Sequence, residues 1–450
     1  MSSVTVVGGG LAGSEAALRL ADLGHDVGLV EMRPVRSTPA HTTDRLAEIV
    51  CTNSFKSEKL DTAHGLLKAE LRRLGCRLLA VADECRVPAG SALAVDRAMF
   101  AGRVSQLVAA HPRIRLRREE VEALPDPPAI VATGPLTSDA LSAAIRTRLG
   151  RDGLAFFDAI APIFSRESID EEVAYLASRY GKGEAAYLNC PFDRSAYEAF
   201  VDALLAADVI GGHDWEAIPY FEGCLPIEEM ARRGRDTLRF GPMRPVGLED
   251  PQGRRPWAVA QLRREDRAGR MWNLVGCQTR MRIGAQKEVF RMIPGLGDAE
   301  FLRYGSIHRN AYLNSPALLS PHGGLPDAPD LIFAGQITGV EGYTESIASG
   351  LLAAVNLDRL ARGEAPVVPP PVTMLGGLYR YLAEADPEHF QPMNANFGLL
   401  DAGGGPWRGR RAARRQALAE RALDAISEWA DEHAIGVTDR DPTARAADAS

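Results

Sequence analysis

The sequence predicts an α/β fold with a Rossmann-like, dinucleotide-binding parallel sheet, and three observations support this prediction. A β-rich run at residues 4–7 opens directly into a G-x-G-x-x-G motif at residues 8–13, followed by an apolar helical pattern. A second β-rich run, residues 27–30, ends at the acidic residue Glu31. Two later apolar runs, residues 129–132 and 331–334, are each closely followed by a glycine.

The opening motif has the residue types that a dinucleotide needs at the start of a helix. Glycine at position 8 permits a tight turn, glycine at 10 lets the backbone approach a pyrophosphate, and glycine at 13 allows close packing of helix on strand. The helix N-terminus adds unpaired N–H groups and a positive dipole end. We therefore expect cofactor contacts from the whole motif: Gly8, Gly9, Gly10, Leu11, Ala12 and Gly13.

Glu31 ends the second strand, where a carboxylate can accept hydrogen bonds from the hydroxyls of an adenosine ribose. Its charge would repel a 2′-phosphate, which argues against a phosphorylated ribose as the tightly bound ligand.

Two further glycine elements indicate which dinucleotide is bound. Gly134 follows the strand predicted at 129–132, and Gly335 with Gln336 follows the strand predicted at 331–334. Three glycine elements separated by long insertions favour FAD over NAD, because NAD needs only one contiguous nucleotide-binding unit. The sequence has no second G-x-G-x-x-G motif, so a nicotinamide cofactor would bind without a Rossmann domain of its own.

The remaining patterns predict further elements and the domain organisation. Helices are expected over residues 14–23, 60–79, 97–108 and 347–360, with proline- or glycine-rich breaks at 363–371 and 403–406. At 450 residues the chain is too long for one core. We expect a discontinuous FAD-binding domain of the two-dinucleotide-binding-domain flavoprotein type at 1–150 and 327–430. An α/β insertion domain is expected at 151–326, and a disordered C-terminal tail at 431–450.

Composition excludes several other classes of protein. The sequence has no membrane-spanning segment, and its first strand begins at residue 4, which predicts a cytoplasmic protein without a targeting peptide. The six cysteines lack metal-ligand spacing, so no metal site is expected. The formal net charge of −7 does not indicate a nucleic-acid binder. Arginine runs at 232–264 and 408–415 are either solvated faces or contacts to a phosphate backbone.

Two cysteines have surroundings that suggest chemistry. Cys51 lies in a polar loop after the second strand and is followed by three small polar residues, although a buried packing cysteine is the simpler interpretation. Cys224 lies between glycine and proline, just before a predicted helix. A thiolate near a helix N-terminus has a lowered pKa and is a better nucleophile at neutral pH.

Thirteen sequence strings between residues 4 and 400 together resemble the folate- and FAD-dependent tRNA (uracil-5-)-methyltransferases, the TrmFO family. They are GGGLAGSEAA, EMRPV, TPAHTTD, CTNSFKS, GLLKAELRRL, PAGSALAVDR, KGEAAYLNCP, FEGCLPIEEMARRG, FGPMRPVGLEDP, IPGL, HRNAYLNSP, FAGQITGVEGYTESIASGL and FQPMNANFGL. A related family, MnmG (GidA), modifies wobble uridines of tRNA and carries a large C-terminal helical domain, for which we expect no room in this chain.

The resemblance implies an activity and its site residues. It implies methylation of carbon 5 of the T-loop uridine of tRNA, at position 54, to ribothymidine. Methylenetetrahydrofolate would donate the carbon and FAD reduced by NADPH or NADH would supply the electrons. The family's two required cysteines match Cys51 and Cys224, and its folate-stacking histidine matches His308. Cys277 stands where the family usually has phenylalanine, and the loop at 280–283 also departs from the usual pattern.

The chemistry requires such residues whatever the family. Carbon 5 of uracil becomes nucleophilic only after a thiolate adds to carbon 6, and a base must then remove the carbon 5 proton. We assign Cys224 as nucleophile and Cys51 as base or second thiol, and these roles are exchangeable. Two alternatives remain: a modifier of wobble uridines like MnmG, and a non-catalytic, FAD-stabilised tRNA-binding protein. The sequence does not fix the oligomeric state, the choice between NADPH and NADH, or the tRNA docking surface.

Overall fold

A six-stranded sheet follows the opening motif. The computed structural model describes residues 2–38, 40–150, 154–210, 225–264, 269–388, 390–401 and 411–435. The strand order in this sheet is β16-β17-β7-β1-β2-β6, and every neighbouring pair is parallel except β16 with β17. The strands are β1 (Ser3–Val7), β2 (Asp26–Glu31), β6 (Ile114–Arg118), β7 (Ala129–Val131), β16 (Gly324–Leu325) and β17 (Ala328–Phe333).

This strand order brings the three glycine elements together. Strands β17, β7 and β1 are neighbours and run in the same direction, so their carboxyl ends meet at one edge of the sheet. Gly335, Gly134 and Gly8 follow those three ends in turn. Ligands of open α/β sheets bind at this edge.

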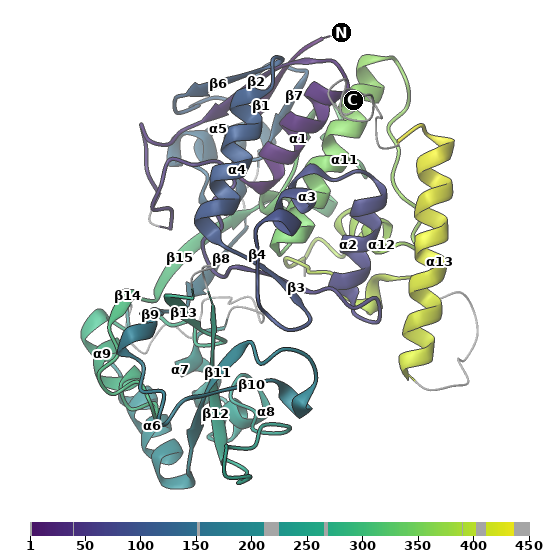
Figure 1. Cartoon of the computed structure of the whole chain (residues 1–450). Coiled ribbons are helices and arrows are strands. Elements are labelled where there is room, and N and C mark those ends of the chain that lie inside the picture. The colour runs from purple at the N-terminus through teal and green to yellow at the C-terminus, as the bar shows by residue number, and fades with distance from the viewer. Residues whose placement is uncertain are drawn as a thin grey trace, which may run out of the picture.

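Helices cover both faces of the sheet (Figure 1). On one face lie α1 (Leu11–Asp22), α4 (Arg97–Ala110) and α11 (Tyr343–Ala361), which share a core with Val6, Ile130 and Ile332. On the other face α5 (Asp139–Leu149) packs with the next residues of the same strands, Val7, Val131 and Phe333. Successive side chains of a strand point to opposite faces, so the three layers form two hydrophobic cores.

A helical region flanks α1 and α11, and it corrects one sequence prediction. The single helix expected over residues 60–79 is two helices, α2 (Ala63–Arg73) and α3 (Arg77–Glu84). The break occurs at Gly75, which has a positive φ of 73°. The carboxylate of Glu15 in α1 then accepts hydrogen bonds from the backbone N–H groups of Arg77 and Leu78, and so starts the new helix. The region also contains α12 (Met374–Glu384), α13 (Arg411–Glu432) and a small sheet of β3 (Ser54–Ser57), β5 (Ala92–Val95) and β4 (Arg86–Val87).

The inserted residues form a second lobe around an antiparallel sheet with its own core (Figure 1). The strand order is β10-β11-β12-β13-β9-β14. The strands are β9 (Ile163–Ser165), β10 (Tyr175–Ala177), β11 (Tyr187–Phe192), β12 (Ala258–Arg264), β13 (Met271–Leu274) and β14 (Phe301–Arg303). The helices are α6 (Arg194–Ala206), α7 (Ile227–Arg232), α8 (Thr237–Phe240) and α9 (Ile283–Phe290).

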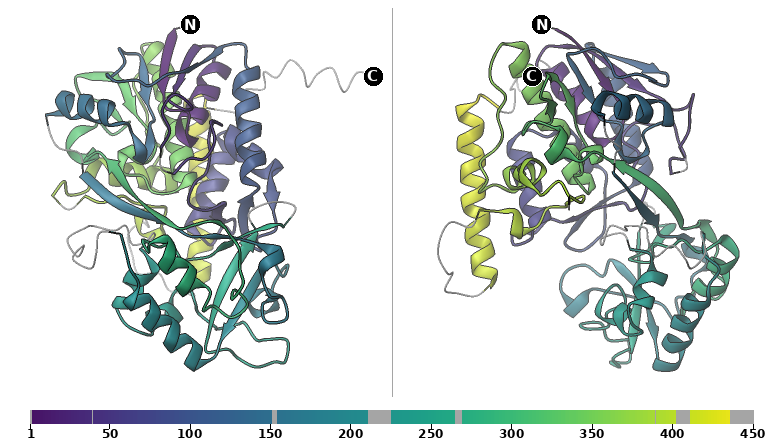
Figure 2. Two further views of the ribbon diagram at one scale, coloured as in Figure 1. Left: turned by 90° about the vertical axis from the view of Figure 1, so that its left-hand side faces the viewer. Right: turned by 180° about the vertical axis from the view of Figure 1, so that it is seen from behind.

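Two antiparallel strands, β8 (Leu154–Ile160) and β15 (Ser306–Tyr312), connect the lobes, as the two views of Figure 2 also show. After β15 the chain enters the core of the first lobe at Leu313, continues through α10 (Ser315–Leu318), and pairs β16 with β17. The boundary expected at 326 is therefore too late by about a dozen residues. None of the helices in the described part of the chain is long and apolar enough to cross a membrane.

The C-terminal tail also starts later than expected. Helix α13 continues to Glu432, and Ile435 is buried in the same core as α1. Apolar side chains of α13 such as Ile426 and Trp429 hold the segment against the first lobe. The tail predicted from residue 431 is thus wrong for residues 431–435, and the rest of it lies outside the described residues.

Candidate functional site

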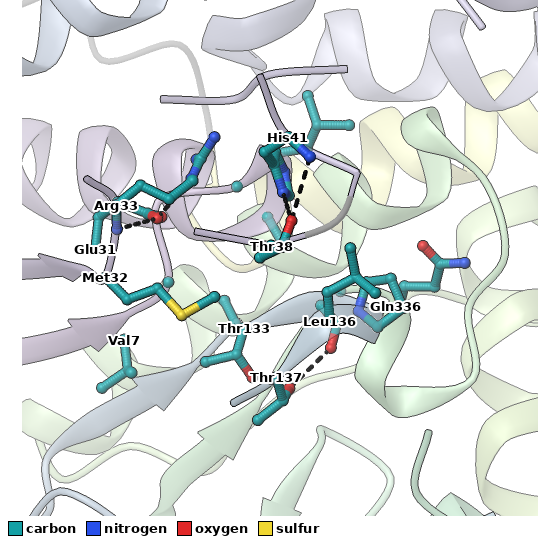
Figure 3. Close-up of a pocket in the computed structure, with 18 of the residues that line it drawn as sticks. Val7, Glu31, Met32, Arg33, Thr38, His41, Thr133, Leu136, Thr137 and Gln336 are labelled. Carbon is teal, nitrogen blue, oxygen red and sulfur yellow. Dashed lines mark hydrogen bonds and ion pairs between the residues drawn. The ribbon is translucent and has the colours of Figure 1, made fainter. Parts of the chain in front are cut away.

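A large cavity lies at the carboxyl edge of the parallel sheet. Its empty space, including the open mouth, is about 1200 Å³. The cavity lies at the sheet edge where open α/β sheets bind their ligands. Its walls come from the ends of β1, β2, β7 and β17, from residues 38–51, and from the start of α11 (Figure 3).

The N-terminus of α1 provides a cradle for an anion in this cavity. Gly8 turns the chain with a φ of 102°, and Gly10, Leu11 and Ala12 also line the cavity. No side chain caps the helix, so its first N–H groups can donate hydrogen bonds to a ligand. A Cβ on Gly10 would meet no heavy atom within 4 Å, so open space lies beside the backbone there. These features fit the pyrophosphate of FAD.

The other two glycines of the motif act behind the cavity wall. A Cβ on Gly13 would lie 1.8 Å from the carbonyl oxygen of Gly8, so only glycine allows α1 to approach the turn this closely. The N–H of Gly9 donates to Oε2 of Glu31 at 2.8 Å. Neither residue is among those that line the cavity. Both therefore shape the turn, whereas their neighbours face the ligand space.

Glu31 lines the cavity and is part of a buried ionic network (Figure 3). Its Oε1 accepts from Nε of Arg33 at 2.8 Å, and Nη1 of Arg33 donates to Oε2 of Glu48 at 3.0 Å. Burial alone would raise the pKa of Glu31, but the hydrogen bonds and charge of Arg33 outweigh it and lower that pKa. The carboxylate is thus ionised and fixed in place, as a ribose acceptor must be.

The third glycine element differs from expectation in one respect. Gly335 and Gln336 line the cavity, as does Gly134 of the second element. However, the N–H of Gly335 donates to Oγ of Ser349 at 2.6 Å, so this donor is already used within the protein. Gln336 donates through Nε2 to Glu341 at 2.6 Å. Gly335 serves the site mainly by its small size, since a Cβ there would come within 2.9 Å of the Cβ of Ala12.

Cys51 also lines the cavity, and the loop that carries it is held on several sides. The hydroxyl of Tyr343, at the start of α11, accepts hydrogen bonds from the N–H groups of Cys51 and Thr52 at 2.9 and 3.1 Å. Arg97 and Arg303 each donate to the carbonyl oxygen of Val50. The thiol is half-buried. This geometry favours a positioned thiol over the packing cysteine that the sequence also allowed.

The residues after Cys51 bind the insertion lobe. Nδ2 of Asn53 donates to the carbonyl oxygen of Arg264 at 2.7 Å, and Nε of Arg263 donates to Oδ1 of Asn53 at 2.9 Å. Arg263 also donates to Oγ1 of Thr52. Both arginines belong to or end β12, so the Cys51 loop lies where the cavity meets the second lobe.

His41 is a site residue that the sequence analysis did not single out. It lines the cavity, and its Nδ1 lies 2.6 Å from Oγ1 of Thr38 (Figure 3). Burial, together with the nearby charge of Arg33, lowers the pKa of His41 to about 4. The ring is therefore neutral at physiological pH. The string TPAHTTD was the available signal, because it is polar and begins seven residues after Glu31, the acidic strand end.

Comparisons with known proteins identify the family. Residues 3–365 match the family model described as glucose inhibited division protein A. The chain is 53% identical over 427 residues to the methylenetetrahydrofolate--tRNA-(uracil-5-)-methyltransferase TrmFO of Anoxybacillus flavithermus, covering 95% of this chain and 99% of that protein. It is 54% identical over 432 residues to TrmFO of Geobacter sulfurreducens, covering 95% and 98%. The chain belongs to the TrmFO family.

The resemblance stated from the sequence is thereby confirmed. A solved structure of GidA from Aquifex aeolicus has a TM-score of 0.69 at 17% identity, over 96% of this chain and 76% of that one. At this identity the likeness concerns the fold alone, and it confirms the Rossmann-like prediction.

Two residues implied by membership of the TrmFO family lie wholly or partly outside the described structure. Cys224 lies outside the described residues, although the helix expected after it is present as α7, from Ile227. His308 lies on β15 opposite Asp158 of β8, on the connection between the lobes, and its side chain is outside the description. Among the other cysteines Cys277, at the unusual position, is buried, and burial raises the pKa of its thiol.

Proposed function

We propose that this protein methylates carbon 5 of the T-loop uridine of tRNA, with methylenetetrahydrofolate as carbon donor and FAD as redox cofactor. NADPH or NADH would reduce the flavin, and the reaction would take place in the cytoplasm. One observation carries the proposal: Cys51 is fixed at the edge of the cavity that the three glycine elements line, where that cavity meets the second lobe. The names of relatives at 53 and 54% identity, both methylenetetrahydrofolate--tRNA-(uracil-5-)-methyltransferases, support the same activity.

The chain supplies a binding site whose parts match those of FAD. The first turn of α1 would bind the pyrophosphate, with Gly10, Leu11 and Ala12 nearest to it. Glu31 would accept hydrogen bonds from the ribose hydroxyls, held in place by Arg33. When bound, the flavin would supply the redox and one-carbon chemistry that side chains cannot perform.

Two thiols would act on the uracil ring. A thiolate adds to carbon 6, which makes carbon 5 nucleophilic, and a second group removes the carbon 5 proton after the carbon is transferred. We assign Cys224 as nucleophile and Cys51 as base or second thiol, and the two roles remain exchangeable. His308, which matches the family's folate-stacking histidine, would stack on the folate ring. It lies on the strand that joins the two lobes.

Modification of wobble uridines remains the second candidate, because GidA shares the fold. It is less well supported, because the likeness to GidA is at 17% identity while the TrmFO relatives exceed 50%. A non-catalytic tRNA-binding protein would not need Cys51 held by Tyr343 beside the cavity.

The test is a reaction of the purified protein with unmodified tRNA, methylenetetrahydrofolate and NADPH or NADH, followed by nucleoside analysis. We expect ribothymidine in the T-loop, and none from a tRNA whose T-loop target is cytidine. Cys51→Ala is the matched protein control and should form no ribothymidine while it keeps its flavin. A product at the wobble position would support the GidA-like function instead. Binding of tRNA without any product in either position would contradict both enzymatic functions.

A further inference from the structure

The insertion lobe has an open, arginine-rich cleft at a place separate from the dinucleotide cavity. It forms where the start of α6, the end of α8 and the loops before β12 come together in the lower part of Figure 1. Its empty space, including open solvent, is about 1420 Å³. The residues that line it are Asp193, Arg194, Arg239, Phe240, Arg244, Pro245, Val246, Arg255, Pro256 and Trp257. Four of them are arginines and one is acidic.

The cleft exposes an aromatic ring and contains a second ring covered by cations. Phe240 is 82% exposed, which is the highest fraction among the large hydrophobic residues of the described chain. The guanidinium carbon of Arg239 lies 3.7 Å from the centre of the Trp257 ring, and that of Arg194 lies 5.1 Å from it. The exposed face of Phe240 is available for stacking, and a base stacked on it would cover the ring.

Two arginines of the cleft have charges that the protein does not neutralise. Asp193, the acid in the cleft wall, caps α6 by accepting from the N–H of Ala196. The other acids nearby are paired with arginines: Glu198 with Arg194, Asp236 with Arg239, Asp202 with Arg235 and Asp250 with Arg254. Arg244 and Arg255 are exposed, and no carboxylate of the described residues forms an ion pair with either. They therefore give the cleft a local positive charge, although the chain carries a net charge of −7.

The cleft is preformed. The guanidinium of Arg179 donates to the carbonyl oxygens of Arg244 and Val246, which fixes the loop that carries Arg244. The backbone N–H of Trp257 donates to the carbonyl oxygen of Phe192 at 2.8 Å, which fixes the other wall of the cleft. Burial and the nearby charge of Arg244 lower the pKa of Arg179, as expected for clustered cations. The backbone of these two walls is therefore already in place before a partner binds, which reduces the entropy lost on binding.

One strand, β12, connects the cleft with the loop that carries Cys51. The strand β12 starts at Ala258, directly after the cleft, and ends at Arg264, whose carbonyl oxygen accepts a hydrogen bond from Asn53 beside the Cys51 loop. Six steps of roughly 3.3 Å put the cleft on the order of 20 Å from that contact. An RNA whose base enters the cavity would therefore have to extend along the insertion lobe to reach the cleft.

We propose that this cleft is an RNA-docking surface, in which Arg244 and Arg255 bind backbone phosphates and Phe240 stacks on an exposed base. The identity of the partner, tRNA, rests on the proposed function. The cleft is a candidate for the tRNA docking surface that the sequence does not fix. Arginines interleaved with aromatic rings are typical of RNA contacts, because the cations bind phosphates and the rings stack on bases. An acidic protein would match the charge but would leave the exposed ring of Phe240 without a base to stack on it.

The test uses full-length protein with flavin bound and measures the affinity for tRNA over a range of salt concentrations. The double variant Arg244→Glu/Arg255→Glu should weaken binding at least about tenfold, and should reduce the slope of log affinity against log salt by about 2, or about 1 per lost phosphate contact. Phe240→Ala should weaken binding about 5- to 100-fold without changing the slope, in keeping with the ~1–3 kcal/mol of one base–aromatic stack. Arg115→Glu, an exposed arginine on β6 of the first lobe, is the matched control and should bind tRNA as the wild type does.

A second ligand separates this proposal from the proposed function. A tRNA with cytidine at the T-loop target should lose affinity equally in the double variant, because the cleft does not contact the target base. Flavin absorbance and melting temperature should equal those of the wild type, which excludes misfolding. Unchanged affinity and slope in the double variant would overturn the proposal even if ribothymidine is formed. Preferential binding of a polyglutamate peptide, lost in the same variants, would assign the cleft to an acidic protein instead.

Discussion

The hydroxyl of Tyr343 lies 2.9 Å from the backbone nitrogen of Cys51 and accepts its hydrogen bond, although 292 residues separate the two in the sequence. The same oxygen accepts from Thr52. Tyr343 is half-buried at the start of α11, and desolvation of its hydroxyl raises the pKa of that group. The helix that packs on α1 thus also fixes the loop that carries the candidate catalytic thiol.

This relationship predicts that Tyr343→Phe reduces methylation while FAD stays bound. The change leaves two N–H groups without their acceptor, and each lost hydrogen bond costs about 1 kcal/mol. A shift of a reacting group by about 1 Å can cost roughly 100-fold in rate, so we expect a loss of about 10- to 100-fold in kcat. Single-turnover methylation and flavin absorbance measure the two effects.

Tyr312→Phe is the matched control, because Tyr312 is a tyrosine whose hydroxyl donates to the carbonyl oxygen of Phe390, away from Cys51. It should keep its activity. A Tyr343→Phe protein with wild-type kcat, or one that loses flavin and activity in equal proportion, would contradict a positioning role.

Glu31→Gln should weaken FAD binding. The amide oxygen can still accept from Gly9, but the charge that holds Arg33 and binds a ribose is lost. Hydrogen bonds to charged groups contribute about 1.5–3 kcal/mol, which corresponds to a drop in affinity of about 10- to 100-fold. Reconstitution of the apoprotein with FAD, followed by fluorescence, gives the affinity.

The control for this variant is Glu58→Gln, a glutamate paired with Arg72 and Arg86 and absent from the cavity wall. It should bind FAD normally. Equal FAD affinity in wild type and Glu31→Gln would show that the second strand end does not bind the ribose.

Local motifs and long-range contacts differ in how far the sequence could predict them. The turn at Gly8 and the acidic strand end at Glu31 were predictable, because spacing over some thirty residues defines them. The bond from Tyr343 to Cys51 was not, since no pattern links residues so far apart. The same holds for Ser349. Its hydroxyl accepts the hydrogen bond from the N–H of Gly335, which we had expected to donate to a ligand.

The break between α2 and α3 was missed for a related reason. The apolar spacing continues across Gly75, so periodicity alone favours one helix over residues 60–79. The second helix is started by Glu15, a residue of α1 that lies sixty residues earlier. A capping carboxylate supplied by another helix leaves no signal in the local sequence.

Stability should depend on Glu345 in acid. The side chain is fully buried, and its contact with His64, whose Nδ1 lies 3.3 Å from Oε1, together with the charge of Lys56 overcomes the cost of burial and lowers the pKa of Glu345 to about 2. A group with a lowered folded pKa stabilises the protein above its unfolded pKa of 4.5, and this stabilisation is lost as pH falls from 4.5 towards 2. The shift corresponds to ~3 kcal/mol.

Unfolding by urea between pH 6 and pH 2.5 measures this effect. In Glu345→Gln the free energy of unfolding should be lower at pH 6 and should fall less steeply below pH 4.5. Glu384→Gln, which changes an exposed glutamate, should follow the wild-type curve. Parallel curves for wild type and Glu345→Gln would contradict the lowered pKa.

The two thiols can be distinguished with tRNA that carries 5-fluorouridine in the T-loop. Fluorine at carbon 5 cannot leave as a proton does, so the thioether at carbon 6 is trapped once the carbon has been transferred. Only the attacking thiol is indispensable for that adduct. Cys224→Ala should therefore abolish covalent capture while FAD stays bound, and denaturing gel electrophoresis measures the capture.

Cys51→Ala should also stop turnover, but its effect on the adduct depends on its role. If Cys51 is the base, the first addition to carbon 6 still occurs, because proton removal follows the addition. Cys51 lies beside the cavity, and its loop is held by hydrogen bonds from Arg97 and Arg303 and to Tyr343. This position suits a base that acts close to the flavin, whereas the nucleophile must reach carbon 6 of the RNA base. A Cys224→Ala protein that still forms a denaturation-resistant adduct, together with a Cys51→Ala protein that forms none, would transfer the nucleophile role to Cys51.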